Sequence, residues 1–366
     1  MSAPKALGPK QVKTIAKALS AWFADHARDL PWRHTRDPYA IWVSEIMLQQ
    51  TRVDTVENYW SKFIERFPTV EALATADQDA VLEQWSGLGY YRRARLLHRG
   101  AQYVHETLAG EVPSSADELR AIPGIGAYTA GAISSIAFDQ PAPLVDGNVA
   151  RVHSRLAAIE QPADQDAKAK HHWRFVEEVL VHGKPRVLAQ ALMELGATVC
   201  MPRSPTCLTC PVRRSCRAHA KGLEQTIPAA KKKKASPEFH FDALVIRRGD
   251  KILLERRPEE GLLAGMWCLP LVERAKPKSH DREALAAAGQ ARFGVALRLD
   301  EAPSTKRVKH VFSHRIWHVR PWTARASKAI KTKGRDDGRV LAWLAEGAEP
   351  EGGIPTLTRK LLRAID

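Results

Sequence analysis

The chain divides into two parts that differ in their pattern of hydrophobic and polar residues. In the first part, apolar residues recur at helical spacing and are interrupted by Gly, Pro or Asp. Asp37-Pro38 is typical of a helix N-terminus, and Ser115 with Glu118 forms a capping box that begins another helix. Apolar residues between Val179 and Leu195 fit further helices. This part is therefore predicted to be all-α.

The second part begins near residue 238 and contains shorter apolar runs. Residues 241–246 and 251–254 flank the sequence Arg-Arg-Gly-Asp and predict a β-hairpin. Asp281–Phe293 has helical spacing, and Val311–Val319 is expected to form a further strand. Together these elements predict an α+β domain.

A chain of 366 residues suits two domains better than one hydrophobic core. Between the two patterns, Pro228, the lysine run 231–234 and Ser236-Pro237 are typical of a solvated linker, although the lysines are also suited to phosphate contact. We therefore expect a domain at residues 1–225, a linker at 226–237 and a second domain at 238–366.

The net charge restricts the kind of partner. A formal charge of +15 and a pI near 9.7 point to a polyanion, although solubility alone also accounts for such a charge. The N-terminus, MSAPKALGPK, lacks the apolar core of a signal peptide, and no apolar run is long enough to span a bilayer. We expect a cytoplasmic protein without membrane association, and we expect it to be a monomer.

Four of the five cysteines lie close together, in the spacing Cys200-x6-Cys207-x2-Cys210-x5-Cys216. A disulfide framework would be spread along a small secreted chain, so metal ligation fits this cluster better. Four thiolates in a short segment can close on one metal centre, and the spacing favours an iron–sulfur cluster over zinc or inert thiols. The fifth cysteine, Cys268, is expected to be a buried core thiol.

Two helical patterns meet at Pro123-Gly124-Ile125-Gly126. Gly124 and Gly126 allow this turn to approach another backbone closely, and the next helix offers its N-terminal N–H groups to a phosphate. A helix–hairpin–helix clamp that holds DNA by its backbone is therefore favoured over a tight helix corner without a ligand.

Two acids stand out as candidates for catalysis. Glu45 lies on a predicted helix among apolar neighbours, where its charged form is disfavoured and it could hold a proton near neutral pH. Asp146 precedes a helical run at Val149–Leu156, and a helix N-terminus favours an ionised carboxylate. One acid that donates and one that stays negative is the pair that glycosidic cleavage needs. Taken singly, a surface carboxylate and a simple N-cap are the alternatives.

Several stretches between about residues 20 and 217 match one known family. They are Leu30-Pro-Trp-Arg, residues 37–51, Gly87-Leu-Gly-Tyr-Tyr-Arg-Arg-Ala-Arg, the Pro123 hairpin, Val145-Asp-Gly-Asn-Val-Ala-Arg and the cysteine cluster. On these motifs the chain resembles the MutY family of adenine DNA glycosylases, within the helix–hairpin–helix superfamily that includes endonuclease III. The resemblance implies an all-α glycosylase domain with a [4Fe-4S] cluster loop at 200–216, followed by an α+β Nudix (MutT-like) domain.

The resemblance also implies roles for individual residues. Glu45 would protonate the adenine ring and later activate water, and Asp146 would stabilise the oxocarbenium-like sugar. Tyr128 and Asn148 match positions that support the reacting sugar and Asp146. The residues that match positions lining the adenine pocket are Arg28, Leu30 and Gln190.

The implied partner is double-stranded DNA with an 8-oxoguanine:adenine or guanine:adenine mispair, from which adenine is flipped before excision. Gln50 and the turn Leu88-Gly89-Tyr90 are similar to the wedges that fill the gap beside 8-oxoguanine. Trp32 and Arg33 match further DNA contacts.

Two other function classes remain open. An endonuclease III-like pyrimidine-lesion glycosylase would also nick the strand through a lysine in the second helix of the hairpin, but that position holds Tyr128. The other class is a non-catalytic DNA-binding module. The missing amine favours simple base excision.

The region from about residue 238 resembles the Nudix domain that MutY proteins carry. A Nudix hydrolase needs Arg-Glu followed by two adjacent glutamates that bind magnesium. Here Arg282-Glu283 is followed by Ala286-Ala287, and alanine cannot ligate a metal. We therefore expect no hydrolysis by this domain. Phe312-Ser313-His314 matches the family's loop that touches 8-oxoguanine, with Ser313 as the hydrogen-bonding residue.

Overall fold

A computed structural model gives the fold of the chain. It describes residues 6–163, 169–230, 235–258, 261–274, 281–312, 314–333, 339–345, 347–348, 350 and 353–365. The chain forms two compact units, one of residues 1–75 and 96–233 and one of residues 76–95 and 234–366. The second unit thus includes a short stretch that lies inside the first predicted domain.

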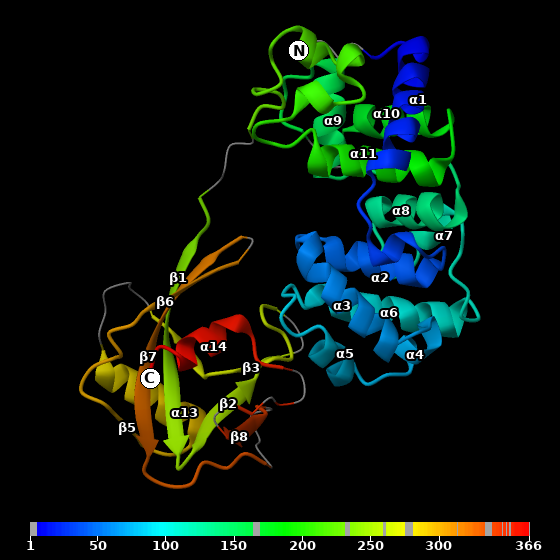
Figure 1. The fold of residues 1–366 in the computed structure, drawn as a ribbon. Coiled ribbons are helices and arrows are strands. Elements are labelled where there is room, and N and C mark those ends of the chain that lie inside the picture. Colours follow the sequence, from blue (N-terminus) through cyan, green and yellow to red (C-terminus); the bar gives the residue numbers. More distant parts are fainter. Residues whose placement is uncertain are drawn as a thin grey trace. The chain divides into compact units, whose positions relative to one another are not determined.

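The first unit is helical, as predicted (Figure 1). Its described elements are α1 (Pro9–His26), η1 (Pro31–Arg33), α2 (Pro38–Leu48), α3 (Val53–Arg66), α4 (Val70–Ala74), α6 (Arg92–Thr107, which begins in the second unit), α7 (Ala116–Leu119), α8 (Ala127–Phe138), α9 (Gly147–Ala157), α10 (Lys170–Leu180), α11 (Pro185–Thr198), η2 (Cys207–Thr209), η3 (Arg213–Ser215) and α12 (Arg217–Ala220).

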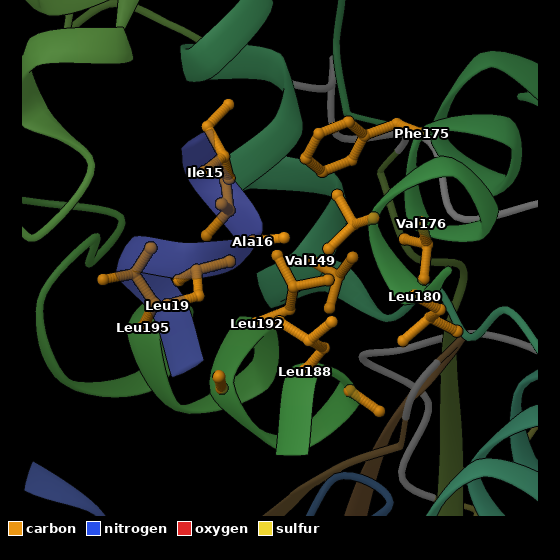
Figure 2. Packing of buried hydrophobic residues seen from close by; sticks show 14 of the residues in the cluster. Ile15, Ala16, Leu19, Val149, Phe175, Val176, Leu180, Leu188, Leu192 and Leu195 are labelled. Carbon is orange, nitrogen blue, oxygen red and sulfur yellow. The ribbon is translucent and has the colours of Figure 1, made fainter. Parts of the chain in front are cut away.

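One large core joins α1, α9, α10 and α11. Each helix has apolar residues on one face, and these residues point toward one another in Figure 2. Ile15 and Leu19 of α1 and Leu192 of α11 are labelled members of this core, and all three are fully buried. The core therefore fixes α9 and α11, which carry candidate site residues, against each other.

The second unit contains α5 (Gln78–Gln84), a sheet and two further helices. The described strands are β1 (Glu238–Arg248), β2 (Lys251–Arg256), β3 (Trp267–Cys268), β4 (Leu271–Glu273), β5 (Leu297–Leu299), β6 (Val308–Val311), β7 (Ile316–Ala326) and β8 (Leu341–Ala345), and the helices are α13 (Arg282–Phe293) and α14 (Thr356–Leu362). The main path of the sheet runs β3-β2-β1-β7-β5, with β1 and β7 parallel.

Alternation along β1 places its side chains on both faces of the sheet. Ala243 and Val245 join the core that includes α14, whereas Leu244 and Ile246 join the core that includes α13. The period-2 pattern of this strand thus supplies two apolar layers.

Most predicted elements of the second part are confirmed. β1 and β2 form the expected antiparallel hairpin, α13 begins after an Asp281 cap, and Cys268 is buried. The single strand expected at 311–319 is wrong, because β6 ends at Val311 and pairs antiparallel with β7. Phe312 N–H donates to Arg315 O (2.9 Å), so the apolar run folds back into a hairpin.

Among the described helices, none is both long enough and apolar enough to cross a membrane.

Candidate active site

Glu45 is a buried carboxylate in the middle of an apolar helix. The Asp37 side chain caps α2 by accepting the Tyr39 N–H (2.9 Å), and the residues from Tyr39 to Met47 are all buried. The helix packs against α3 and α8, which covers it on two sides. Glu45 retains only 5% of its accessible surface. The prediction of a carboxylate in apolar surroundings is therefore confirmed.

Asp146 is the N-cap of α9. Its Oδ1 accepts the Val149 backbone N–H (2.7 Å), and its Oδ2 accepts a hydrogen bond from the Asn148 side-chain amide (2.8 Å). Asn148 in turn packs closely against α11 at Gly196. A Cβ added to Gly196 would lie only 2.6 Å from the Asn148 Cβ. Both carboxylate oxygens are thus oriented by donors.

Tyr128, in the first turn of α8, is hydrogen-bonded to Glu45 within the cavity. Its hydroxyl donates to Glu45 Oε2 (2.8 Å) and also lies 3.2 Å from Met193 Sδ. Glu45, Asp146, Tyr128 and Asn148 all line one cavity of about 840 Å³. The structure therefore brings together the four residues predicted to be catalytic.

The pKa of Glu45 is raised to about 7. Burial is the main cause, because it disfavours the charged carboxylate, and the nearby Asp146 carboxylate adds to the rise. The Tyr128 hydrogen bond and the positive charge of Arg33 act in the opposite direction. Glu45 therefore holds a proton over much of the range below neutral pH.

The pKa of Asp146 is also raised from its ordinary value, again mainly by burial. The hydrogen bonds from Val149 and Asn148 and the positive charge of Arg151 oppose this rise. The predicted helix-end stabilisation of the ionised form is therefore present, but desolvation outweighs it.

A second buried acid, Glu194 of α11, was missed by the sequence analysis. It accepts a bidentate pair of hydrogen bonds from Arg28 (2.8 and 2.9 Å) and one from Arg33 (2.7 Å). These bonds lower the pKa of Glu194 to about 2 despite burial. The available signal was its position four residues after Gln190, on the same face of α11.

The predicted pocket residues Leu30 and Gln190 are buried and line the cavity with Arg28 and Arg33. Trp32, predicted as a DNA contact, is also buried in the wall of this cavity. Arg33 also lies over the Phe23 ring, 5.2 Å from its centroid. Arg33, predicted as a DNA contact, is thus held at the cavity wall by Glu194.

The two glycines of the Pro123–Gly126 hairpin have different surroundings. Gly124 has φ +88°, and a Cβ there would lie 2.8 Å from Leu96 Cβ. Gly126 is the N-cap of α8 and has no atom near its missing Cβ. The N-terminus of the 12-residue α8 is therefore left open to a phosphate.

The predicted wedges occupy strained turns. Gln50 is exposed with φ +60°, and Tyr90 is 47% exposed with φ +50°. In the turn that carries Tyr90, Leu88 is buried, and the Gly89 carbonyl accepts the Trp85 indole N–H (3.1 Å). The Tyr90 ring is therefore presented by a fixed turn, whereas Leu88 points into the protein.

The four clustered cysteines converge on one small cavity. Cys200, Cys207, Cys210 and Cys216 all line it, together with Arg155. Burial and the neighbouring thiols raise the pKa of Cys210 to about 12. Thiolates this close together repel one another, and a positively charged metal centre would relieve that repulsion. The four cysteines are therefore a suitable donor set for such a centre.

Arginines connect this loop to α9. Arg155, 2% exposed, donates to Cys200 Sγ (3.2 Å) and to the Met201 carbonyl (2.7 Å). Arg151 donates to the Cys200 carbonyl and to Asn148 Oδ1 (both 2.8 Å). A continuous set of hydrogen bonds therefore runs from the cysteine loop through Arg151 to Asn148, which donates to Asp146.

In the second unit, Ser313 lies outside the described residues. Its neighbour Phe312 packs edge-on against Trp317, with ring centroids 4.9 Å apart. Ala286 of α13 packs against the apolar core that includes Leu285 and Phe293 of the same helix.

Comparison with known proteins identifies both parts. Residues 43–178 match the model of the HhH-GPD superfamily base excision DNA repair proteins, and residues 242–364 match the NUDIX domain. A thermostable thymine-DNA glycosylase of known structure is 30% identical, with a TM-score of 0.54, and the match covers 58% of this chain and 98% of that protein.

Curated relatives extend the match along most of the chain. The adenine DNA glycosylase of Rattus norvegicus is 36% identical over 355 residues, covering 83% of this chain and 69% of that protein. The adenine DNA glycosylase of Mus musculus is 34% identical over 386 residues, covering 91% of this chain and 74% of that protein. The chain therefore belongs to the MutY family of adenine DNA glycosylases.

Proposed function

We propose that this protein excises adenine mispaired with 8-oxoguanine or guanine in duplex DNA, by hydrolysis of the N-glycosidic bond. The observation that carries the proposal is that Glu45 and Asp146 line one cavity, with Tyr128 bonded to Glu45. Because a paired base cannot reach a buried carboxylate, adenine must leave the helix stack first.

Glu45 is proposed as the general acid. In its protonated form it gives a proton to a ring nitrogen of adenine, and the C1′–N bond then breaks with its electron pair moving to the base. Water adds to C1′ and returns a proton to the Glu45 carboxylate. The raised pKa of Glu45, about 7, makes this cycle available at neutral pH.

Asp146 is proposed to stabilise the positive sugar that remains. Its carboxylate is held by Asn148 and the α9 backbone, so it needs little reorganisation as charge develops. General acid catalysis alone supplies roughly 10²–10⁴-fold, less than the 10⁶-fold or more that enzymes usually reach. The electrostatic contribution of Asp146 is therefore required.

Arg28, Leu30, Gln190 and the Glu194 ion pair are proposed to form the adenine pocket. The paired Glu194 keeps Arg28 and Arg33 at the wall of the cavity. A pocket with fixed polar groups can discriminate between bases through their ring edges.

We propose that Cys200, Cys207, Cys210 and Cys216 hold a [4Fe-4S] cluster. When bound, such a cluster cross-links the loop and supplies a fixed charge, and it takes no part in the excision chemistry described above. Arg213, Arg214 and Arg217 in this segment are suited to phosphate contact. Reduced thiols are needed for ligation, which favours a location in the cytoplasm.

The turn between β6 and β7, at residues 312–315, is proposed to recognise 8-oxoguanine through Ser313. The protein is proposed to act as a monomer, since one chain carries both acids and the turn. Tyr128 stands where a strand-nicking glycosylase would need a lysine, so we expect simple base excision.

The test uses an end-labelled duplex with one 8-oxoguanine:adenine pair and a second duplex with guanine:adenine. Purified protein should produce alkali-labile sites at adenine, with no strand break before alkali. Glu45→Gln should bind both duplexes but lower the single-turnover excision rate by roughly 10²–10⁴-fold or more. In the parent protein, the rate should fall as the pH rises through about 7, as Glu45 loses its proton.

Glu65→Gln is the matched control, because Glu65 is an exposed residue of α3 that lies outside the cavity. It should excise adenine at the parent rate. Full activity of Glu45→Gln would overturn the assignment of the acid. Strand breaks at a thymine-glycol pair without alkali would favour the pyrimidine-lesion class instead.

A further inference from the structure

The Tyr128 hydroxyl has two possible hydrogen-bond acceptors within reach. Glu45 Oε2 lies 2.8 Å from its oxygen and Met193 Sδ lies 3.2 Å away. A phenol has a single O–H, so it can make only one full hydrogen bond as a donor, while its oxygen can accept another. A thioether is a weak acceptor and a carboxylate is a strong one.

The protonation state of Glu45 decides which acceptor is used. When Glu45 is a carboxylate, the Tyr128 proton points to Oε2 in a charge-assisted bond. When Glu45 is a carboxylic acid and its proton lies on Oε2, that oxygen donates to Tyr128, and the phenolic proton must turn elsewhere. Met193 Sδ is the second acceptor that the structure places within reach. In this state Met193 therefore offers the phenolic proton a partner within the protein.

We propose that the Met193 thioether is a positioning group that accepts the Tyr128 hydrogen while Glu45 is protonated, and so lets the acid form persist in the cavity. The inference rests on the proposed role of Glu45 as the general acid. Met193 also lines the cavity, and in the proposed role it contacts Tyr128 rather than the reacting atoms. It acts through Tyr128 and stabilises one of the two protonation states of Glu45.

Other groups around Glu45 come from each element that faces it. Asp146 of the α9 N-cap disfavours the carboxylate of Glu45, and Arg33 of η1 favours it. Glu194 of α11 also lines the cavity, but Arg28 and Arg33 compensate its charge. None of these groups changes when Met193 is replaced by a residue of similar size.

The test measures the pKa of Glu45 in the free, full-length protein by infrared difference titration against Glu45→Gln. Met193→Leu keeps the volume of the side chain and removes the sulfur, and Met193→Ile gives a second sulfur-free variant if Leu packs poorly. We expect the pKa of Glu45 to fall by roughly 0.5 or more, the equivalent of one modest hydrogen bond. The pH at which the excision rate begins to fall on the alkaline side should decrease by the same amount.

A double-variant cycle separates this role from packing. In a Tyr128→Phe background the hydroxyl is absent, so Met193→Leu should leave the pKa of Glu45 unchanged. Met266→Leu, a buried methionine of the second unit, is the matched control and should change neither quantity. An unchanged pKa in Met193→Leu, or an equal shift in both backgrounds, would overturn the inference.

The two proposals fail in different ways. If Glu45→Gln kept full excision activity, the general acid would be wrong, but the infrared titration would still report whether Met193 sets the pKa of Glu45. If excision needs Glu45 and the titration shows no effect of Met193, only the positioning role is lost.

Discussion

Two buried glutamates in one cavity have opposite electrostatic behaviour. Glu45 and Glu194 are 5% and 1% exposed, so burial alone would raise the pKa of both. Glu194 receives direct hydrogen bonds from two guanidinium groups, which outweigh its burial. Glu45 receives one bond from a neutral phenol, which does not. The number and charge of the donors, rather than the depth of burial, separates a structural anion from a candidate acid.

This difference predicts how Glu194→Gln changes stability. At pH 7 the variant leaves Arg33 without its buried anion, and we expect a loss of roughly 2–3 kcal/mol of unfolding free energy. This loss is smaller than the roughly 3–5 kcal/mol typical of a fully buried ion pair, because Arg28 is 38% exposed. The folded pKa of about 2 lies below the usual value of 4.5, so this stabilisation is complete above pH 4.5 and is lost as the pH falls toward 2. Urea denaturation at pH 7 and pH 3 measures the loss of unfolding free energy and its dependence on pH.

The difference between parent and variant should therefore be smaller at pH 3 than at pH 7. Glu178→Gln is the control, because Glu178 pairs with Arg174 on the surface of α10. It should change stability by less than about 1 kcal/mol. Equal losses for Glu194→Gln at both pH values would show that packing, and not the charge of Glu194, is responsible.

At the scale of elements, α8 combines the hairpin with the site. It follows the Gly126 N-cap and carries Tyr128 in its first turn. Its residues are mostly small or apolar, and all of those from Thr129 to Ile136 are buried. Gly131, in its middle, lies against the chain at Pro143, just before Asp146. A Cβ at Gly131 would stand 2.0 Å from the Pro143 carbonyl oxygen. The missing side chain therefore allows the segment that leads to the α9 cap to cross α8 closely.

Gly131→Ala tests this close approach. In an isolated helix, Gly to Ala stabilises by about 1 kcal/mol, but the clash with backbone cannot be relieved by a side-chain rotation and costs roughly 1–3 kcal/mol or more. We expect a net loss of stability and a lower excision rate, measured by thermal unfolding and by single-turnover kinetics. Gly8→Ala, at a position with nothing within 4 Å, should be close to neutral. A stabilised Gly131→Ala would contradict the packing described here.

At the scale of the whole molecule, the cysteine loop ties distant segments of the first unit together. The Gln11 side chain of α1 donates to the Ser215 carbonyl (2.9 Å), and Arg217 donates to the Ala6 carbonyl (2.9 Å). Arg155 of α9 donates to the Ile227 carbonyl (2.8 Å) and to the loop. The loop is therefore bonded directly to Gln11 of α1, and Arg155 joins it to the C-terminal segment of this unit.

Removal of the proposed cluster should loosen these contacts selectively. After iron is oxidised and chelated, we expect loss of visible absorption, a lower melting temperature, and faster hydrogen exchange at residues 200–217 and in the first turn of α1. The sheet of the second unit serves as an internal control and should exchange as before. Unchanged exchange in the loop, despite complete loss of iron, would contradict a structural role for the cluster.

Local signals predicted several parts of the site. The Asp37 cap, the apolar run around Glu45 and the Asp146 cap are set by neighbouring residues, and each was found where expected. The spacing of Glu194 from Gln190 placed it on the same face of α11, but no local signal revealed its ion pair with Arg33 or the contact of Met193 with Tyr128, because these partners are far away in the chain. The strand predicted across residues 311–319 was wrong, since apolar periodicity alone does not reveal the turn between β6 and β7.

The sequence by itself determined the two-part architecture, the caps, the glycine hairpin and the spacing of the four cysteines, because these depend on residues a few positions apart. Tertiary structure alone decided which carboxylate carries a proton and which is neutralised, because a pKa depends on burial and on charges brought from other helices. It also decided that the Tyr128 hydroxyl lies within hydrogen-bond distance of both Glu45 and Met193, because these three residues come from different helices.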